Sequence, residues 1–185
     1  ALAECNICFM MAPKFHAAMR HIAPVRQELG LRTLFNLLGP LSNPAGAKRQ
    51  LIGVYDRQWL EPMAEVLRNL GTEHAWIVHG SDGMDELTTT GPSYVTELKD
   101  GAIRSFEVTP EEIGIERAKP KALQGGLPEE NARAITNLLR KAENPYRDIV
   151  LLNSAAALII AGKADDLASG AALAAEAIDS HRAKE

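Results

Sequence analysis

Two adjacent carboxylates, Asp85 and Glu86, are the residues whose types and spacing point most directly to chemistry. They follow a predicted buried strand, His74 to His79, and ligands in open α/β sheets bind beyond the carboxyl ends of strands. Neighbouring carboxylates repel each other unless a cation offsets their charge, and Mg²⁺ takes oxygen ligands of this kind together with water and substrate phosphates. On spacing alone, two solvated loop acids remain the favoured interpretation.

Arg26 is a second candidate, because a guanidinium can bind a carboxylate through two parallel hydrogen bonds. From the residues alone, a surface arginine that pairs with Glu28 or another local acid is the favoured interpretation. Cys5 and Cys8 form a single C-x-x-C, which suits a redox pair or half of a zinc site. Since no second cysteine pair exists and apolar residues surround them, two reduced core thiols are the favoured interpretation.

Other patterns that could carry chemistry are weak. Gly125-Gly126 is not followed by the Lys-Ser/Thr of a phosphate loop, and the five histidines show no metal-ligand spacing. No Ser-His-Asp arrangement is apparent, so the sequence assigns no catalytic nucleophile. The formal net charge of -4 argues against nucleic acid or an anionic membrane as the main partner.

The elements that must position the carboxylates read as an α/β fold with a mostly parallel sheet flanked by helices. Leu51 to Tyr55 and His74 to His79 predict strands joined by a helix that Asp56 caps, a unit that normally gives a parallel pair. Around Lys99-Asp100-Gly101, the segments Tyr94 to Leu98 and Ile103 to Val108 predict a hairpin.

Three helices are predicted to complete the chain: Pro128 to Lys141, Tyr146 to Ala161 and Asp165 to His181. The middle one is apolar nearly all round and should be deeply buried. Near the N-terminus, Ile7 to Met11 predicts a buried strand. His16 to Leu29 predicts a helix that Pro24 kinks or divides, and Thr33 to Leu38 predicts a shorter one ending at Gly39-Pro40.

Two segments, Arg32 to Pro44 (RTLFNLLGPLSNP) and His79 to Leu87 (HGSDGMDEL), together closely resemble the anthranilate phosphoribosyltransferase family of tryptophan biosynthesis. The resemblance covers nearly the whole chain. It implies a fold of the nucleoside phosphorylase and phosphoribosyltransferase kind, with transfer of a phosphoribosyl group from phosphoribosyl diphosphate to the amine of anthranilate. It also implies magnesium as the cofactor, bound by Asp85 and Glu86.

The anthranilate site implied by the resemblance comprises Arg26 for the carboxylate and a pocket wall of Ala12, Pro13, His16 and Met19. A first-turn histidine usually caps or packs, so we assign His16 to substrate binding and not to proton transfer. The family pattern reads His-Pro-Ala-Met where this chain has His16-Ala17-Ala18-Met19.

The family's phosphate-binding motifs, including a Gly-Thr-Gly-Gly-Asp loop, do not occur in this chain. The resemblance places them upstream of residue 1, so we expect a fragment that is inactive or nearly so by itself. By the same resemblance, residues 1–15 and 45–185 belong to the α/β domain. Residues 16–44 are expected to contribute to a small helical domain, through which the complete protein forms a homodimer.

No apolar run is long enough to span a bilayer and no signal-peptide pattern opens the chain, which predicts a cytoplasmic protein that binds small molecules. Two rivals remain. A pyrimidine nucleoside phosphorylase fits the Arg32 to Pro44 motif and the carboxylate pair poorly. A nucleic-acid-binding relative of the same fold would show a basic groove and a strong salt dependence.

Overall fold

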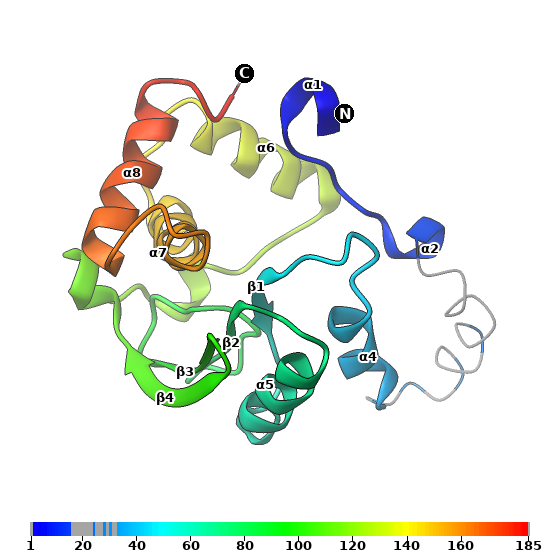
Figure 1. Cartoon of the computed structure of the whole chain (residues 1–185). Helices are drawn as coiled ribbons and strands as arrows, with labels where there is room; N and C mark the ends of the chain where they lie inside the picture. The colour runs from blue at the N-terminus through cyan, green and yellow to red at the C-terminus, as the bar shows by residue number, and fades with distance from the viewer. Residues whose placement is uncertain (1, 16–23, 25–27, 29, 31–32, 185) are drawn as a thin grey trace. The chain divides into compact units, whose positions relative to one another are not determined.

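The computed structural model describes residues 2–15, 24, 28, 30 and 33–184, without the side chains of Ala12 and Pro13. The chain divides into two compact units, residues 1–47 and residues 48–185 (Figure 1). This division does not test the assignment of segments to domains of a longer protein, which stays a prediction.

The first unit contains three described helices: α1 (Leu2–Cys5), α2 (Ala12–Phe15) and α4 (Phe35–Leu41). The short helix predicted at Thr33 to Leu38 therefore forms, but it continues through Gly39 and Pro40 instead of ending there. Pro40 has no N–H to donate to the Asn36 carbonyl, and the Ser42 backbone N–H closes the last turn by donating to the Leu38 and Gly39 carbonyls.

Residues 7–11 are irregular, so the buried strand predicted at Ile7 to Met11 is wrong. The side chains of Ile7 and Phe9 are 74% and 86% exposed, and none of the described strands pairs with this segment. An apolar run becomes a strand only where a partner completes its backbone hydrogen bonds. Cys5 and Cys8 are exposed free thiols, which also contradicts the prediction of core thiols.

The second unit is built on a four-stranded sheet in the order β1 (Arg49–Gly53), β2 (His74–Gly80), β3 (Ser93–Lys99), β4 (Ala102–Val108). The α/β class predicted from the sequence is confirmed. Among the described strands, β1 and β2 form the parallel pair that was expected. The pairs β2–β3 and β3–β4 are antiparallel. The hairpin predicted around Asp100-Gly101 is confirmed, and both turn residues have positive φ.

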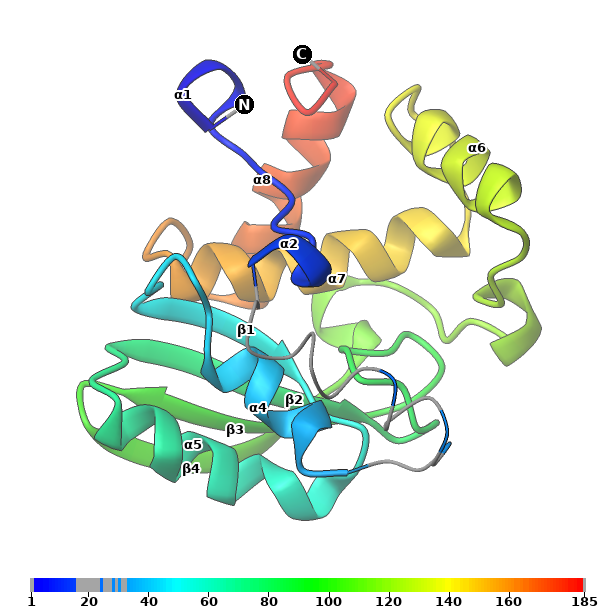
Figure 2. The same ribbon diagram turned by 90° about the vertical axis from the view of Figure 1, so that its right-hand side faces the viewer.

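Between β1 and β2 the chain forms a 3₁₀ turn, η2 (Arg57–Trp59), and helix α5 (Leu60–Asn69). Asp56 caps the turn as predicted, its side chain accepting a hydrogen bond of 3.0 Å from the Gln58 backbone. Helix α5 packs on one face of the sheet, as Figure 2 shows. Leu60, Met63, Ala64 and Leu67 are its buried residues.

After the sheet come two 3₁₀ turns, η3 (Pro110–Ile113) and η4 (Pro120–Ala122), and then helices α6 (Pro128–Leu138), α7 (Pro145–Ile160) and α8 (Leu167–Asp179). Helix α7 covers the sheet face opposite α5 (Figure 2) and contacts β1, β2 and α8. Gly170 permits the close approach of α8, because a Cβ atom there would lie 2.8 Å from the Cα of Ala155.

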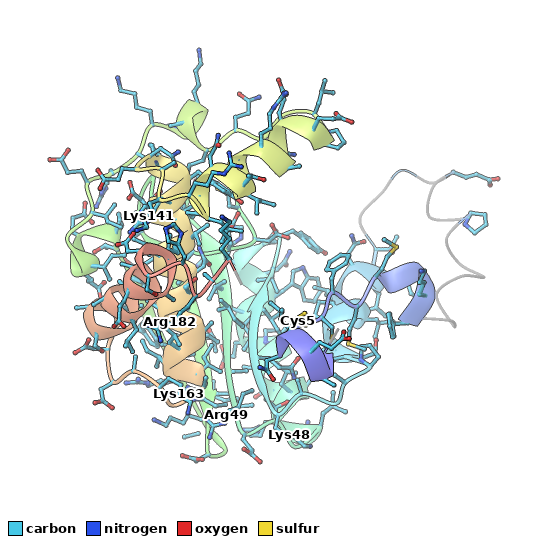
Figure 3. The ribbon with its side chains drawn as sticks, turned by 90° about the horizontal axis from the view of Figure 1, so that it is seen from above. Cys5, Lys48, Arg49, Lys141, Lys163 and Arg182 are labelled. Carbon is cyan, nitrogen blue, oxygen red and sulfur yellow. The ribbon has the colours of Figure 1, made fainter. Side chains whose placement is uncertain are left out.

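The core lies between the sheet and helices α7 and α8. The side chains of Trp76 and Phe106 meet edge to face with ring centroids 5.2 Å apart. Helix α7 is not buried all round as predicted, since Ala157 is exposed and Val150 and Ser154 are half-buried. At its carboxyl end, Arg49 donates a hydrogen bond of 2.6 Å to the Ile160 carbonyl, and Figure 3 labels Arg49 and Lys163 on this side of the unit.

A buried carboxylate, Glu97 on β3, lies on the same face of the sheet as Trp76, its partner across the strand pair. It accepts hydrogen bonds from the Trp76 ring nitrogen at 2.8 Å and the His74 ring at 2.9 Å, and it pairs with Arg104. Burial by itself would raise the pKa of Glu97, but these donors outweigh that effect and lower the pKa. Three neighbouring strands are thus joined through one side chain.

Candidate active site

The two predicted site carboxylates lie in the loop that follows β2. Asp85 is exposed and Glu86 is half-buried. Because β1 and β2 run parallel, their carboxyl ends meet at one edge of the sheet, and the loop lies at that edge. The loop is closed at its base by two backbone hydrogen bonds, from Gly80 to Met84 at 2.8 Å and from Ser81 to Pro92 at 3.0 Å.

Gly53, the last residue of β1, lies directly against this loop. A Cβ atom at this position would be 1.5 Å from the carbonyl oxygen of Asp85. No side chain fits at position 53, and the loop can approach the strand because glycine has none. Val54 extends the pairing beyond Gly53, its backbone donating to Val78, and its own carbonyl accepts a 2.8 Å hydrogen bond from the His79 ring.

Asp82 organises the same loop from within. One carboxylate oxygen accepts from the hydroxyls of Thr88 and Thr90, both at 2.7 Å, and the other accepts from the Met84 backbone at 3.2 Å. Burial alone would raise the pKa of Asp82, but the two hydroxyls and the backbone donor reverse the effect and lower it. Both oxygens of this carboxylate are therefore engaged within the loop itself.

Asn153 on α7 binds the loop from the helix side. Its side-chain oxygen accepts from the Leu87 backbone nitrogen at 3.0 Å, and its side-chain nitrogen donates to the Leu87 carbonyl at 2.8 Å. The same nitrogen donates to the Ile149 carbonyl at 3.0 Å, one turn earlier in the helix. The residue directly after Glu86 is thereby attached to the core of the unit, where the Leu87 side chain is fully buried.

The electrostatics of the loop favour a cation. The pKa of Glu86 is raised by burial first and then by the negative charges of Asp85 and Asp82. The described residues hold no group of three or more potential metal ligands. Two carboxylates nevertheless fit Mg²⁺, which usually keeps several waters and shares its shell with substrate phosphates.

A cavity of about 380 Å³ opens beside Glu86 and reaches along α7. Asn153 and Ser154 contribute polar atoms to its lining, while the remaining walls are mostly apolar: Met84, Leu123, Tyr146, Ile149, Val150 and Ala157. The half-exposed side of α7 noted above is thus one wall of this cavity. A carboxylate at the rim of a mixed polar and apolar hollow is a common setting for a small-molecule site.

The predicted anthranilate-binding residues cannot be placed in the same way. His16, Met19 and Arg26 lie outside the described residues. Ala12 and Pro13 are in α2, where the backbone is described and the side chains are not. Their assignment to the substrate pocket stays a prediction, whereas Asp85 and Glu86 lie together in the predicted loop.

Two residues of this site, Gly53 and Asn153, escaped the sequence analysis. A glycine ending a strand is ordinary in sequence, and its importance comes from a loop 32 residues further on. For Asn153 an indication did exist. An asparagine inside the run Leu151 to Ile160, in a helix predicted to be buried, indicates that its amide has hydrogen-bond partners elsewhere in the fold.

The sheet, the carboxylate loop and the adjoining cavity all lie within a stretch of the chain that matches a known family of glycosyl-transfer domains. Residues 1–184 match the family described as glycosyl transferase family, a/b domain, and the chain belongs to that family.

Within this family, the chain is similar to anthranilate phosphoribosyltransferases. It is 58% identical over all 185 residues to the enzyme of Rhodospirillum rubrum and 62% identical to that of Parvibaculum lavamentivorans, covering 53% and 54% of their lengths. The chain therefore spans about half the length of the curated relatives it matches.

Solved structures agree. The anthranilate phosphoribosyltransferase of Thermus thermophilus is 47% identical with a TM-score of 0.89, over 98% of this chain and 54% of that one. The Saccharomyces cerevisiae enzyme in complex with phosphoribosyl diphosphate (PRPP) and Mg is 30% identical with a TM-score of 0.87, over 95% of this chain and 51% of that one.

Proposed function

We propose that the protein to which this chain belongs transfers the phosphoribosyl group of phosphoribosyl diphosphate to anthranilate, a step of tryptophan biosynthesis. The products are N-(5-phosphoribosyl)anthranilate and diphosphate. The observation that carries the proposal is the Asp85–Glu86 pair, fixed at the carboxyl edge of the sheet beside a cavity. The similarity to anthranilate phosphoribosyltransferases, one of them in complex with phosphoribosyl diphosphate and Mg, supports it.

In this reaction the amine nitrogen of anthranilate forms a bond to the anomeric carbon of the ribose. The bond from that carbon to the diphosphate oxygen breaks, and the amine loses a proton. Asp85 and Glu86 would hold magnesium, which when bound neutralises negative charge on the leaving diphosphate. The carboxylates of this loop contribute by keeping that charge compensation in a fixed place, since preorganised electrostatics need no rearrangement during the reaction.

The acceptor half of the proposal rests on the sequence. Arg26 would bind the anthranilate carboxylate, with Ala12, Pro13, His16 and Met19 as the pocket wall, and this would orient a weak amine nucleophile. No covalent enzyme intermediate is required. We further propose that the 185-residue chain alone is inactive or nearly so, and that the active protein is a cytoplasmic homodimer.

The alternative is a relative that binds nucleic acid instead of catalysing transfer. Figure 3 labels several basic residues on one side of the second unit, among them Lys48, Arg49 and Arg182. These three cations are engaged within the chain: Lys48 with the Gly71 carbonyl, Arg49 with the Ile160 carbonyl and Arg182 with Glu176. They do not favour a free phosphate-binding surface, so transfer remains the better supported function.

The test uses protein expressed from the complete reading frame that encodes this chain. Loss of anthranilate fluorescence is followed after addition of phosphoribosyl diphosphate, with and without Mg²⁺. Magnesium-dependent loss that falls sharply in Arg26→Ala supports the proposal. No loss from pure, folded protein would overturn it, and a salt-dependent DNA titration would then examine the alternative.

The 185-residue chain, assayed in parallel, tests its own predicted inactivity. Robust turnover by the chain alone would contradict that part of the proposal.

A further inference from the structure

We propose that Asn153 is a positioning residue for the metal-binding carboxylates: it fixes Asp85 and Glu86 by bonding both peptide groups that flank Leu87. This inference rests on the proposed function only in taking Asp85 and Glu86 as the metal ligands. Asn153 itself lines the cavity beside Glu86 and is not assigned any contact with substrate or metal.

Asn153 attaches the carboxylate loop to the rest of the unit. In the described structure, the hydrogen bonds of residues 85–87 are the two between Leu87 and Asn153, at 3.0 Å and 2.8 Å. Before this stretch, Met84 is bonded to Gly80 and Asp82, and after it Thr88 is bonded to Asp82. The carboxylate pair therefore lies in the one stretch that Asn153 attaches to the rest of the unit.

The side chain of Asn153 is itself held in place by helix α7. Asn153 makes a third hydrogen bond, 3.0 Å long, to the Ile149 carbonyl of its own helix, so its amide plane is fixed at both ends. Ile149 and Leu152, which flank it on α7, are 5% and 0% exposed. The rotamer of Asn153 is thus set by a packed helix, as a group that positions metal ligands requires.

An asparagine at position 153 is unusual for the helix in which it lies. Leu151, Leu152, Ala155 and Ala156 are its neighbours in a mostly apolar helix, and Asn153 is itself half-buried. An amide that is partly removed from water is unfavourable unless its hydrogen bonds are satisfied. Here its oxygen and nitrogen together make three bonds, two of them to the loop. An apolar residue at this position would leave the Leu87 backbone N–H and carbonyl without these partners.

The experiment compares wild-type protein from the complete reading frame with Asn153→Ala. Asn137→Ala, an exposed asparagine of α6, is the matched control. Three readouts are taken: exchange of the Leu87 amide hydrogen, direct Mn²⁺ binding measured by electron paramagnetic resonance, and the Mg²⁺ concentration for half-maximal anthranilate consumption. Asn153→Leu, which keeps the number and branching of the side-chain heavy atoms, replaces Asn153→Ala if thermal unfolding shows that the alanine variant does not fold.

We expect faster Leu87 exchange, metal affinity weaker by roughly 10-fold or more, and recovery of most of the rate at saturating Mg²⁺. Asn137→Ala should match the wild type in all three. A folded Asn153 variant with Mn²⁺ affinity and Mg²⁺ midpoint within twofold of wild type would overturn the inference. If the wild type consumes no anthranilate, the proposed function fails, while exchange and Mn²⁺ binding still decide the role of Asn153.

Discussion

Gly53 and Asp85 approach so closely that the Cβ atom of any other residue at position 53 would stand 1.5 Å from the Asp85 carbonyl oxygen. The end of β1 is thus in direct contact with the backbone of the carboxylate loop. The position of a Cβ atom is fixed by the backbone and the carbonyl oxygen is part of the backbone, so a rotamer change cannot relieve the contact. Either the strand or the loop must move to accept a side chain.

We therefore expect Gly53→Ala to lower the free energy of unfolding by about 2–3 kcal/mol, the upper part of the range for overpacked sites. Urea denaturation measures this value. Gly125→Ala is the control, because a Cβ atom there meets nothing closer than the Asn131 side-chain oxygen at 3.3 Å. Equal stability of the Gly53 variant and the wild type would contradict the close packing of loop and strand.

Asp85→Asn and Glu86→Gln should each weaken the magnesium response. Removing one of two adjacent charges halves the attraction for the cation while keeping the shape of the side chain. We expect the rate at a fixed, subsaturating Mg²⁺ concentration to fall by at least roughly 100-fold. Asp100→Asn, in the β3–β4 turn where asparagine also tolerates positive φ, should leave the rate unchanged. Rates that stay at the wild-type level in both site variants would remove these acids from the metal site.

Asp82→Ala should destabilise the loop without removing a metal ligand. The substitution leaves the hydroxyls of Thr88 and Thr90 without the acceptor that each now binds at 2.7 Å. A loss of about 1–3 kcal/mol in unfolding free energy follows from the lost charge-assisted hydrogen bonds. Chemical denaturation at neutral pH checks it, and Asp165→Asn, an exposed acid, serves as the reference. A stability indistinguishable from wild type would show that the Asp82 bonds contribute little.

Glu97 predicts a dependence of stability on pH. Its pKa in the folded state is lowered, because donors on Trp76, Arg104 and His74 outweigh the cost of burial. A lowered folded-state pKa means that the stabilisation is complete above the unfolded-state pKa, about 4.3 for glutamate, and is lost as the pH falls through the folded-state value. The wild type should therefore exceed Glu97→Gln by about 1.5–3 kcal/mol near pH 7.

That advantage should shrink as the pH is lowered from 5 toward 3. Urea midpoints at several pH values provide the measurement. Glu107→Gln, an exposed glutamate on the same hairpin, should change stability by less than about 0.5 kcal/mol. A difference between wild type and Glu97→Gln that stays constant with pH would show that the Glu97 charge is not the source.

Local patterns predicted most of the second unit. The hairpin followed from Asp100-Gly101, and the start of the β1–β2 connection from Asp56, because turn and cap chemistry act over a few residues. The apolar run Ile7 to Met11 predicted a strand wrongly, since a strand also needs a partner that no local pattern supplies.

The site divides in the same way. Asp85 and Glu86 could be found because they are adjacent within a motif that resembles a known family. Gly53 and Asn153 could not be read from their neighbours, because their partners are distant in the chain. Glu97 was missed for a related reason: its donors come from β2 and β4, and one of the two strands precedes it by more than 20 residues.

The bond from Leu87 to Asn153 spans 66 residues. During synthesis, the strand, the hairpin and the carboxylate loop therefore leave the ribosome well before the helix that fixes the loop. At roughly 5–20 residues per second, translation separates the two by several seconds. Over that interval the nascent chain carries Asp85 and Glu86 on a loop that lacks its bonds to Asn153. By the inference drawn for Asn153, the loop would bind metal tightly only after helix α7 has emerged.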